Sequence, residues 1–428
     1  MSFPLPETFQ RQSDLGLTAD QTRFAALREL LPKLALAILS GWLLWKSISL
    51  DYPFWRRFLT FPRIELVRTT DWFLPTATLK PASLPIPLTP PGSGMPPADF
   101  ALAVNYAGAR DSNALLVWSN GQLLLERYWK PYDATSMTQS QSMHKSLLAL
   151  AVGVALQQGL IGSLDDPAEQ YLPPTWAGAG RGITIRHLLA MSSGLDQEHG
   201  NPASPFSLTS RLFMSSDIRE VALSIRSVGK PGEKFEYNNV NPQLLVTVLE
   251  SAARMSYAEF LSSSVWSRVA EREARVWLDH GGGTAHGYCC LMATARDWLR
   301  VGVLFATVGS SPSGNVVSPQ WIEQVVAPSL ANPNYGFLTW IGSPYLSARG
   351  YRQRVGGPFA ARQTKPFAAA DLVFFDGYGG QRVYISRSMR LVIVRTGREV
   401  QDWDDAELPN LVVSSLQAAA PVREGPTL

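Results

Sequence analysis

The sequence predicts an α+β fold, because strand-like segments occur towards both ends of the chain and helix-like segments occupy the region between them. Two apolar runs joined by Asn120-Gly121 lie within residues 113–129, and strand signals return at 371–397. Residues 160–330 have instead the patterns of helices and loops. Strands separated in this way indicate one sheet built from distant segments with a helical insertion, and not repeated βαβ units.

Each of these elements has a local signal. Asn-Gly between apolar runs is the strongest short hairpin signal, so residues 113–129 are predicted to form an antiparallel pair. The segment 146–156 is apolar on every side, which predicts a helix that is buried all round. Towards the other end, residues 383–386 and 391–395 alternate or run apolar, with β-branched residues between turn residues, as is typical of strands.

The first hundred residues differ in composition from the rest. A polar segment, 1–33, precedes the apolar stretch 34–50, and the segment 51–98 contains eight prolines from Pro75 onwards. Prolines remove backbone donors and favour extended chain, so 51–98 is predicted to be a linker or a strap on the surface. Residues 99–420 then form the predicted globular domain, with a helical subdomain at about 160–330.

The stretch 34–50 is predicted to be an uncleaved membrane anchor. Only residues 34–45 are free of charge, whereas a bilayer span takes roughly twenty residues, so a span requires Lys46 to reach the interface. A signal sequence and a soluble or interfacial helix remain alternatives. Because basic residues lie on both sides of the stretch, charge does not decide its orientation.

Composition argues against other classes of protein. The 428 residues are 46% hydrophobic and 17% charged, as in globular proteins with a core. The formal net charge is only +3 and no long Lys/Arg run occurs, so no nucleic-acid partner is expected. Cys289 and Cys290 are adjacent, which excludes an ordinary disulfide between them, and we expect two small buried residues.

The first chemical signal is the pair Ser142 and Lys145, at the start of the predicted buried helix. Residues three apart on a helix lie on one face, so the hydroxyl and the amine can meet, although two polar residues on a first turn are also common. The N–H of Ser142 would lack an intrahelical partner there and could supply half of an oxyanion hole. A second Ser-x-x-Lys, at 227–230, precedes Pro231, which disfavours helical geometry.

Two further patterns support this interpretation. Tyr237 and Asn239 form a Tyr-x-Asn on the turn before a predicted helix, where a phenol can relay a proton and an amide can orient the lysine or bind a substrate carbonyl. In DGYGGQRVYI the glycines allow a close approach to the strand, and the N–H of Gln381 could complete the oxyanion hole. Taken singly, both patterns are also typical of turns.

Together these three patterns resemble those of the serine β-lactamase and penicillin-binding protein family. The Tyr-x-Asn motif is similar to that of the class C branch, and SMHKS, PGEKFEYNNVNPQLL and GYGGQ are closest to esterases and 6-aminohexanoate-dimer hydrolases. The resemblance covers roughly residues 100–397. It implies a β-lactamase/transpeptidase-like fold, with a central antiparallel sheet flanked by helices and a helical subdomain, and acyl transfer through a serine ester.

The resemblance also implies roles for individual residues. Ser142 would be the nucleophile, and Lys145 and Tyr237 would handle its proton. Which of the two is the base stays open, because coupled groups titrate as a unit. The implied oxyanion donors are the N–H groups of Ser142 and Gln381, and the implied substrate contacts are Asn239, Tyr378 and Gly380.

One departure from the family pattern bears on the substrate. β-Lactam-recognising relatives carry a Lys-Thr-Gly-like third motif, whose cation meets the substrate carboxylate, whereas the matching residues here are Tyr378-Gly379-Gly380. Arg382 could replace that cation only if its side chain faced the cleft. We therefore expect a small-molecule ester or linear amide substrate, without an obligatory carboxylate.

Two other functions stay open. One is a membrane-tethered penicillin-binding or sensor-like protein that does not turn over, and the other is a true β-lactamase. The implied location is the inner membrane, with the hydrolase domain outside the cytoplasm, and a cytoplasmic location stays open as well.

The sequence offers little for competing chemistry. It contains no G-x-S-x-G elbow, no phosphate-binding loop and no H-E-x-x-H zinc helix, so no cofactor is expected. His280 and His286 are close in sequence but have no plausible third ligand nearby, so no metal is predicted. His144 lies inside the Ser-x-x-Lys, and on a helix it would point away from the Ser–Lys face.

Overall fold

The computed structural model describes most of the chain and divides it into two compact units. The described residues are 19–62, 66–92, 98–176, 178, 180–196, 204–350, 360–398 and 402–419. The first unit covers residues 1–55 and the second covers 56–428. The start of the predicted polar segment, 1–18, and residue 420 at the predicted end of the domain lie outside the described residues.

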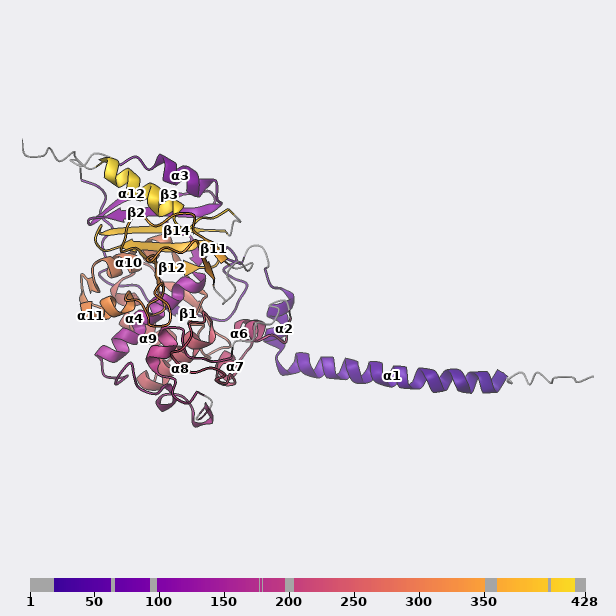
Figure 1. Cartoon of the computed structure of the whole chain (residues 1–428). Helices are drawn as coiled ribbons and strands as arrows, with labels where there is room; N and C mark the ends of the chain where they lie inside the picture. Colours follow the sequence, from indigo (N-terminus) through magenta and orange to yellow (C-terminus); the bar gives the residue numbers. More distant parts are fainter. Residues whose placement is uncertain are drawn as a thin grey trace, which may run out of the picture. The chain divides into compact units, whose positions relative to one another are not determined.

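The second unit is built on a six-stranded antiparallel sheet with strands from both ends of the chain (Figure 1). Its order is β3-β2-β14-β13-β12-β9. The bounds are β2 (Ser112–Ser119), β3 (Gln122–Tyr128), β9 (Trp340–Ile341), β12 (Val373–Gly377), β13 (Gln381–Ser386) and β14 (Leu391–Gly397). The pairing of β2 with β14 joins segments far apart in sequence. The predicted α+β layout is confirmed.

The predicted hairpin is also confirmed. Asn120 and Gly121 connect β2 to β3, with φ angles of 49° and 91°. Two successive positive φ angles define a type I′ turn, whose twist matches the strands that it joins.

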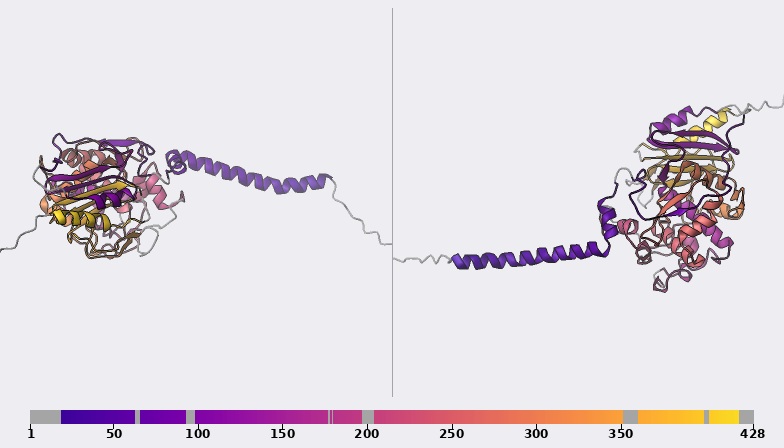
Figure 2. Two further views of the ribbon diagram at one scale, coloured as in Figure 1. Left: turned by 90° about the horizontal axis from the view of Figure 1, so that it is seen from above. Right: turned by 180° about the vertical axis from the view of Figure 1, so that it is seen from behind.

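Helices cover both faces of this sheet. The helices α3 (Ala101–Gly108) and α12 (Glu407–Ala419) pack side by side, and Figure 2 shows them over the strands. On the other face lie α10 (Ala295–Ala306), which packs on β2, β13 and β14, and α4 (His144–Gln157). Every residue of α4 from His144 to Ala155 is buried, as the apolar run at 146–156 predicts.

The remaining elements form the helical region and a second sheet. The helices are α5 (Ile185–Leu189), α6 (Leu208–Met214), α7 (Ile218–Leu223), α8 (Val240–Ala253), α9 (Tyr257–Ser264) and α11 (Pro319–Val325). Short 3₁₀ turns are η1 (Gln141–Met143), η2 (Ala168–Gln170), η3 (Pro174–Trp176) and η4 (Trp266–Arg268). The second sheet has the order β1-β5-β6-β4, with β1 (Thr76–Leu79), β4 (Met137–Gln139), β5 (Ala274–Trp277) and β6 (Leu291–Thr294). Two small ladders pair β7 (Ser310–Ser311) with β8 (Gly314–Asn315) and β10 (Ala348–Gly350) with β11 (Ala360–Arg362).

The segment 51–98, predicted as a linker or surface strap, contributes to the folded body. Its strand β1 pairs with β5, and Phe73 and Leu79 are fully buried. The Phe73 ring stacks on Trp277 with centroids 4.3 Å apart. Apolar residues between the prolines thus join the core, a role that proline content alone does not reveal.

The apolar stretch 34–50 lies in a long helix of the first unit. This helix, α1 (Ala19–Leu50), is followed by α2 (Tyr52–Leu59). Of the helices in the described part of the chain, none combines the length and the apolar character needed to cross a membrane, and the predicted transmembrane anchor is not supported.

Candidate active site

Ser142 lies in a tight turn directly before the buried helix. The turn η1 follows β4, and α4 begins at His144. Gln141 has a φ of 48°, in the left-handed region that residues with a Cβ seldom adopt. The helix therefore begins two residues later than the sequence suggests, and the 3₁₀ turn still places Ser142 beside Lys145.

Lys145 contacts the serine directly. Its Nζ lies 2.8 Å from Ser142 Oγ, 2.9 Å from Asn239 Oδ1 and 3.0 Å from the carbonyl oxygen of Tyr288. Lys145 is 1% exposed, and this burial lowers its pKa from 10.5 to about 7, although Asp376 acts in the opposite direction. Near neutral pH much of the amine is therefore uncharged and able to accept a proton.

Tyr237 is the second titratable group at this place. The centroid of the Tyr237 ring lies 4.7 Å from Lys145 Nζ, and the Tyr237 hydroxyl forms a hydrogen bond with Ser142. Burial, and then the Asp376 carboxylate, raise the pKa of Tyr237 well above its usual value. The ring stacks on Trp340 with centroids 5.5 Å apart. These opposite shifts favour Lys145 as proton acceptor and Tyr237 as neutral proton donor.

Asn239 reaches the lysine because its neighbour caps the following helix. The helix α8 begins directly after Asn239, whose side chain makes no capping hydrogen bond. The Oδ1 of Asn238 instead accepts from the N–H of Asn241 at 2.8 Å. Asn238 thus caps the N-terminus of the helix, and the side chain of Asn239 binds the Lys145 amine.

The third motif forms the turn between β12 and β13. Gly377 is close to η1, because a Cβ at this position would overlap the carbonyl oxygen of Ser140. Gln381 is buried and lies opposite Gly377 in the strand pair. Tyr378, which follows Gly377, is 49% exposed. The turn is thus adjacent to the serine, whereas the oxyanion role of the Gln381 N–H stays a prediction.

Two arginines lie behind this turn. Arg382 is buried in ion pairs with Asp376 and Asp405, so its charge is not exposed as a replacement for the missing cation. Gly380, predicted as a substrate contact, has a φ of +72°, and a Cβ on it would come within 2.6 Å of Arg395 Nη1. Its lack of a side chain therefore serves the packing of Arg395 as well as any approach of substrate.

The described histidines are not grouped as a metal site. Buried His144 makes hydrogen bonds with the carbonyl of Cys289 and the hydroxyl of Tyr257, at 2.7 and 3.0 Å, away from the Ser–Lys pair as expected. His286 is buried among aromatic rings, whereas His280 is at the surface. In the described ranges, no three His, Cys, Asp or Glu side chains are grouped so as to hold a metal ion. Cys289 and Cys290, expected to be free and buried, are buried but joined as a vicinal disulfide.

Three residues of the site were not predicted from the sequence. The carbonyl of Tyr288 accepts from Lys145, but a backbone acceptor has no residue-type signal. Trp340 stacks on Tyr237 from a distant strand, which spacing cannot indicate. Asp376 could have been noticed, because an acidic residue in an apolar strand directly before the third motif is unusual.

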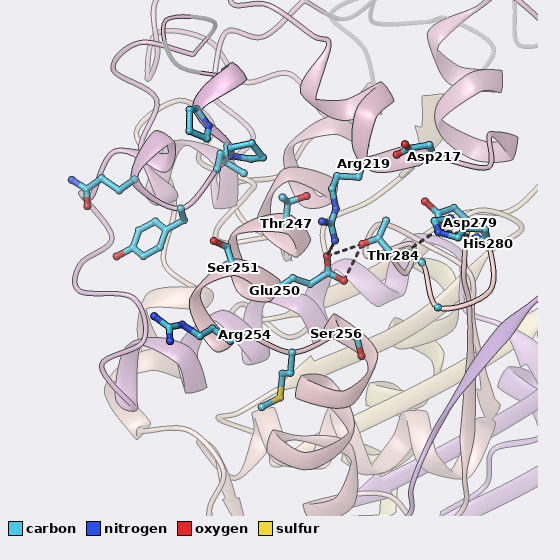
Figure 3. A pocket seen from close by; sticks show the side chains of 18 residues that line it. Asp217, Arg219, Thr247, Glu250, Ser251, Arg254, Ser256, Asp279, His280 and Thr284 are labelled. Atoms are coloured by element: carbon cyan, nitrogen blue, oxygen red, sulfur yellow. Dashed lines mark hydrogen bonds and ion pairs between the residues drawn. The ribbon is translucent and has the colours of Figure 1, made fainter.

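A cavity of about 780 Å³ lies elsewhere on the second unit (Figure 3). Its lining includes Glu250, which accepts hydrogen bonds from Arg219 and Thr284, and none of the predicted site residues. Those polar side chains satisfy each other, so we assign no role in the chemistry to this cavity.

Comparison with known proteins agrees with this arrangement. The family model described as β-lactamase matches residues 101–412. The chain therefore belongs to the β-lactamase family, and the predicted family and its β-lactamase/transpeptidase-like fold are confirmed.

Individual relatives include both hydrolases and penicillin-binding proteins. The chain is 30% identical over 231 residues to the 6-aminohexanoate-dimer hydrolase of Paenarthrobacter ureafaciens, a match that covers 50% of this chain and 57% of the relative. It is 28% identical over 169 residues to penicillin-binding protein 4* of Bacillus subtilis (strain 168), covering 37% and 36%. The chain thus spans little more than half of the first relative and about a third of the second.

Solved structures share the fold over a longer range. One from Bacillus anthracis, assigned as a 6-aminohexanoate-dimer hydrolase, has a TM-score of 0.61 at 19% identity and covers 83% of this chain and 91% of its own. The octameric penicillin-binding protein homologue from Pyrococcus abyssi has a TM-score of 0.53 at 17% identity, covering 76% and 78%. At these identities the likeness concerns the fold.

The pKa of Lys145 leads to a prediction about pH. A lysine with a pKa of about 7 is protonated below that pH and cannot accept the serine proton, so kcat/KM for an uncharged ester should rise as pH increases through about 7 and then level off. Below the midpoint the fall should approach about tenfold per pH unit. Hydrolysis is measured from pH 5 to 10, with circular dichroism as the control for folding. A rise centred near pH 10 would show that the lysine is not perturbed.

Proposed function

We propose that this chain is a serine hydrolase that cleaves esters or linear amides through a covalent acyl-serine intermediate. The observation that carries the proposal is the surroundings of Lys145. A neutral amine has two N–H donors and one lone pair, which match two acceptors, Asn239 Oδ1 and the Tyr288 carbonyl, and one hydroxyl, that of Ser142. None of these three partners is a carboxylate, so the site favours an uncharged lysine that can accept the serine proton.

In the proposed acylation step Ser142 Oγ attacks the substrate carbonyl and gives its proton to Lys145. The N–H groups of Ser142 and Gln381 would stabilise the negative oxygen that develops. A proton then passes to the leaving oxygen or nitrogen, from Lys145 directly or through the neutral phenol of Tyr237, as the bond to the carbonyl carbon breaks. Asn239 binds the amine through Oδ1, which leaves its Nδ2 to meet a substrate carbonyl.

Deacylation would repeat these steps with water as the nucleophile. Water gives a proton to Lys145, attacks the acyl carbon and releases the acid, and the proton returns to Ser142 Oγ. Turnover therefore requires one lysine that both accepts and returns a proton, which a pKa of about 7 permits at neutral pH.

The substrate is proposed to be an ester or a linear amide rather than a penicillin. Tyr378 stands where β-lactam-recognising relatives have a cation, and Arg382 is held by Asp376 and Asp405. The 6-aminohexanoate-dimer hydrolase relative bears the name of a hydrolase of a linear amide, which supports this class of substrate.

A protein that is acylated but does not turn over is the second candidate. The penicillin-binding relatives favour it. Mass spectrometry after incubation with an aryl ester separates the candidates, since a stable adduct on Ser142 without released acid identifies the second function. The presence of Lys145, Tyr237 and Asn239 around Ser142 supports turnover instead.

We expect Ser142→Ala to abolish ester hydrolysis. A nucleophile and its base act as one unit, so the loss should be about a thousandfold or more, and Lys145→Ala should be nearly as damaging. Ser146→Ala is the matched control, because Ser146 is a buried serine one turn along that hydrogen-bonds to the Leu338 carbonyl. A tenfold loss of kcat corresponds to only about 1.4 kcal/mol of activation free energy. Retention of more than about a tenth of wild-type kcat by Ser142→Ala would therefore contradict the assignment.

Tyr378 should decide between neutral and acidic substrates. A charge-assisted hydrogen bond contributes roughly 1.5–3 kcal/mol, so its absence should make kcat/KM for an aryl ester at least about tenfold higher than for a chromogenic cephalosporin. Tyr378→Lys should narrow this ratio by improving the cephalosporin more than the ester. Tyr378→Phe is the control for the loss of the hydroxyl. Efficient cephalosporin hydrolysis by the unmodified chain would instead support a true β-lactamase.

Membrane attachment through residues 34–50 also remains a proposal. Its support is the apolar run before Lys46, whose ammonium lies over the Trp42 ring. The 428-residue chain should then fractionate with membranes after a high-salt wash. We propose the inner membrane with the domain outside the cytoplasm, and a cytoplasmic domain is the alternative.

Two deletions test the boundary. Removal of residues 1–50 should leave a folded, active hydrolase that stays in the supernatant. Removal of 1–89 takes away β1 and the buried side chains of Arg57, Phe73 and Leu79. It should unfold the domain, since one buried Phe contributes about 3–5 kcal/mol. A full-length chain that stays in the supernatant would overturn the membrane attachment. A variant without residues 1–89 that remains folded would overturn the structural role of β1 and the residues before it.

A further inference from the structure

Two buried arginines donate hydrogen bonds to most of the carbonyl groups of the third-motif turn. Arg382 Nη1 donates to the carbonyl oxygens of Gly377 and Gln381, both at 3.0 Å. Arg395 Nη1 donates to those of Gly379 and Gly380, at 2.8 and 3.0 Å. These are four of the five carbonyl groups between Gly377 and Gln381, so one side of the turn is held almost completely by guanidinium groups.

A peptide plane then fixes the direction of its N–H. In a trans peptide the carbonyl and the following N–H point in opposite directions. The peptide of Gly377 carries the N–H of Tyr378, and the peptide of Gly380 carries the N–H of Gln381. The N–H of Tyr378 is therefore directed away from Arg382, and the N–H of Gln381 is directed away from Arg395.

We propose that Arg382 and Arg395 are positioning residues that hold the N–H groups of Tyr378 and Gln381 towards the acyl oxygen of a substrate bound at Ser142. The inference rests on the proposed function and names what prepares its oxyanion hole. Its second support is the packing of η1, the turn that carries Ser142, against both β12 and β13 at this place. Preorganised donors stabilise developing charge without reorganisation during the reaction, which is the main requirement for an oxyanion hole.

Arg395 differs from Arg382 in its charge balance. Arg382 is paired with Asp376 and Asp405. Arg395 is fully buried, and among the described residues its hydrogen bonds go to neutral oxygens and no carboxylate pairs with it. Besides the turn these acceptors are Ser112 Oγ and the carbonyls of Arg110 and Arg398. The positive charge behind the carbonyls polarises the peptides and strengthens their N–H groups as donors.

Glycines at two positions make room for this guanidinium. A Cβ on Gly380 would lie 2.6 Å from Arg395 Nη1, and a Cβ on Gly397 would overlap Nη2. On its remaining side the guanidinium lies 4.6 Å from the centroid of the Trp403 ring. Gly380, Gly397 and Trp403 thus each accommodate the guanidinium of Arg395.

The test compares Arg395→Lys with Arg57→Lys. Arg57 is a matched control, because it is a buried arginine that donates to the carbonyls of Leu74, Met214, Ser215 and Asp279 and stacks on Phe73, and none of these partners is a predicted site residue. Lysine keeps the charge but lacks the planar fork that reaches several carbonyls. Both variants should lose thermal stability, but only Arg395→Lys should lower kcat for an aryl ester, by about tenfold to a hundredfold, with KM changed less than about threefold.

A second pair of variants covers the case in which Arg395→Lys does not fold. Gly380→Ala adds a methyl group that displaces the Arg395 guanidinium and should lower kcat in the same way. Gly121→Ala is its control, since Gly121 also has a positive φ, +91°, but nothing lies within 4 Å of the added atom. Activity is expressed per folded molecule, measured by near-ultraviolet circular dichroism.

The outcomes separate this inference from the proposed function. Hydrolysis that persists in Ser142→Ala overturns the function itself. Loss of activity in Ser142→Ala together with wild-type kcat in a folded Arg395→Lys or Gly380→Ala variant overturns only the positioning role. An equal loss of kcat in each variant and its control also overturns it, because the effect would then be general destabilisation.

Discussion

The burial of one lysine amine among neutral acceptors is the constraint on which the site depends. A charged ammonium in this place would have lost its water without gaining a carboxylate, so the fold shifts Lys145 towards its uncharged form. The same burial keeps Tyr237 protonated. One physical cause thus produces an acceptor and a donor next to Ser142, and no metal ion or cofactor is needed to explain how the serine loses its proton.

Buried arginines in and beside the sheet pair with the carboxylate that lies near Lys145. Asp376 lies near Lys145 and tends to raise its pKa, which would work against a neutral amine. The carboxylate is shared with Arg349 and Arg382, and Asp405 completes a buried group of two arginines and two aspartates. Removal of one partner would leave a buried charge uncompensated, which would destabilise the domain and change the electrostatic field at Lys145.

The sequence predicted the parts of the site whose signals are local. Ser142 and Lys145 are three residues apart, and Tyr237 and Asn239 share one turn, so spacing alone brings each pair together. The α+β layout also followed from the pattern. The contacts of Tyr288 and Trp340 depend on chain segments that only the fold brings together. The segment 51–98 was misjudged because proline content describes the backbone, whereas the burial of Phe73 and Leu79 decides where the segment packs.

The two arginines behind the third motif would also explain how a site that contains much positive charge favours the neutral substrates that we propose. The Arg382 side chain is held by two carboxylates, and Arg395 by backbone and hydroxyl oxygens, so each guanidinium is directed into the protein. A substrate carboxylate at the turn would lose water without meeting either of them, a costly exchange. In the proposed mechanism the oxygen that becomes negative only during the reaction is different, because the polarised N–H groups of the turn would reach it. The charge would therefore act on the transition state and not on a ground-state anion, which is what the proposed hydrolysis of uncharged esters or amides requires.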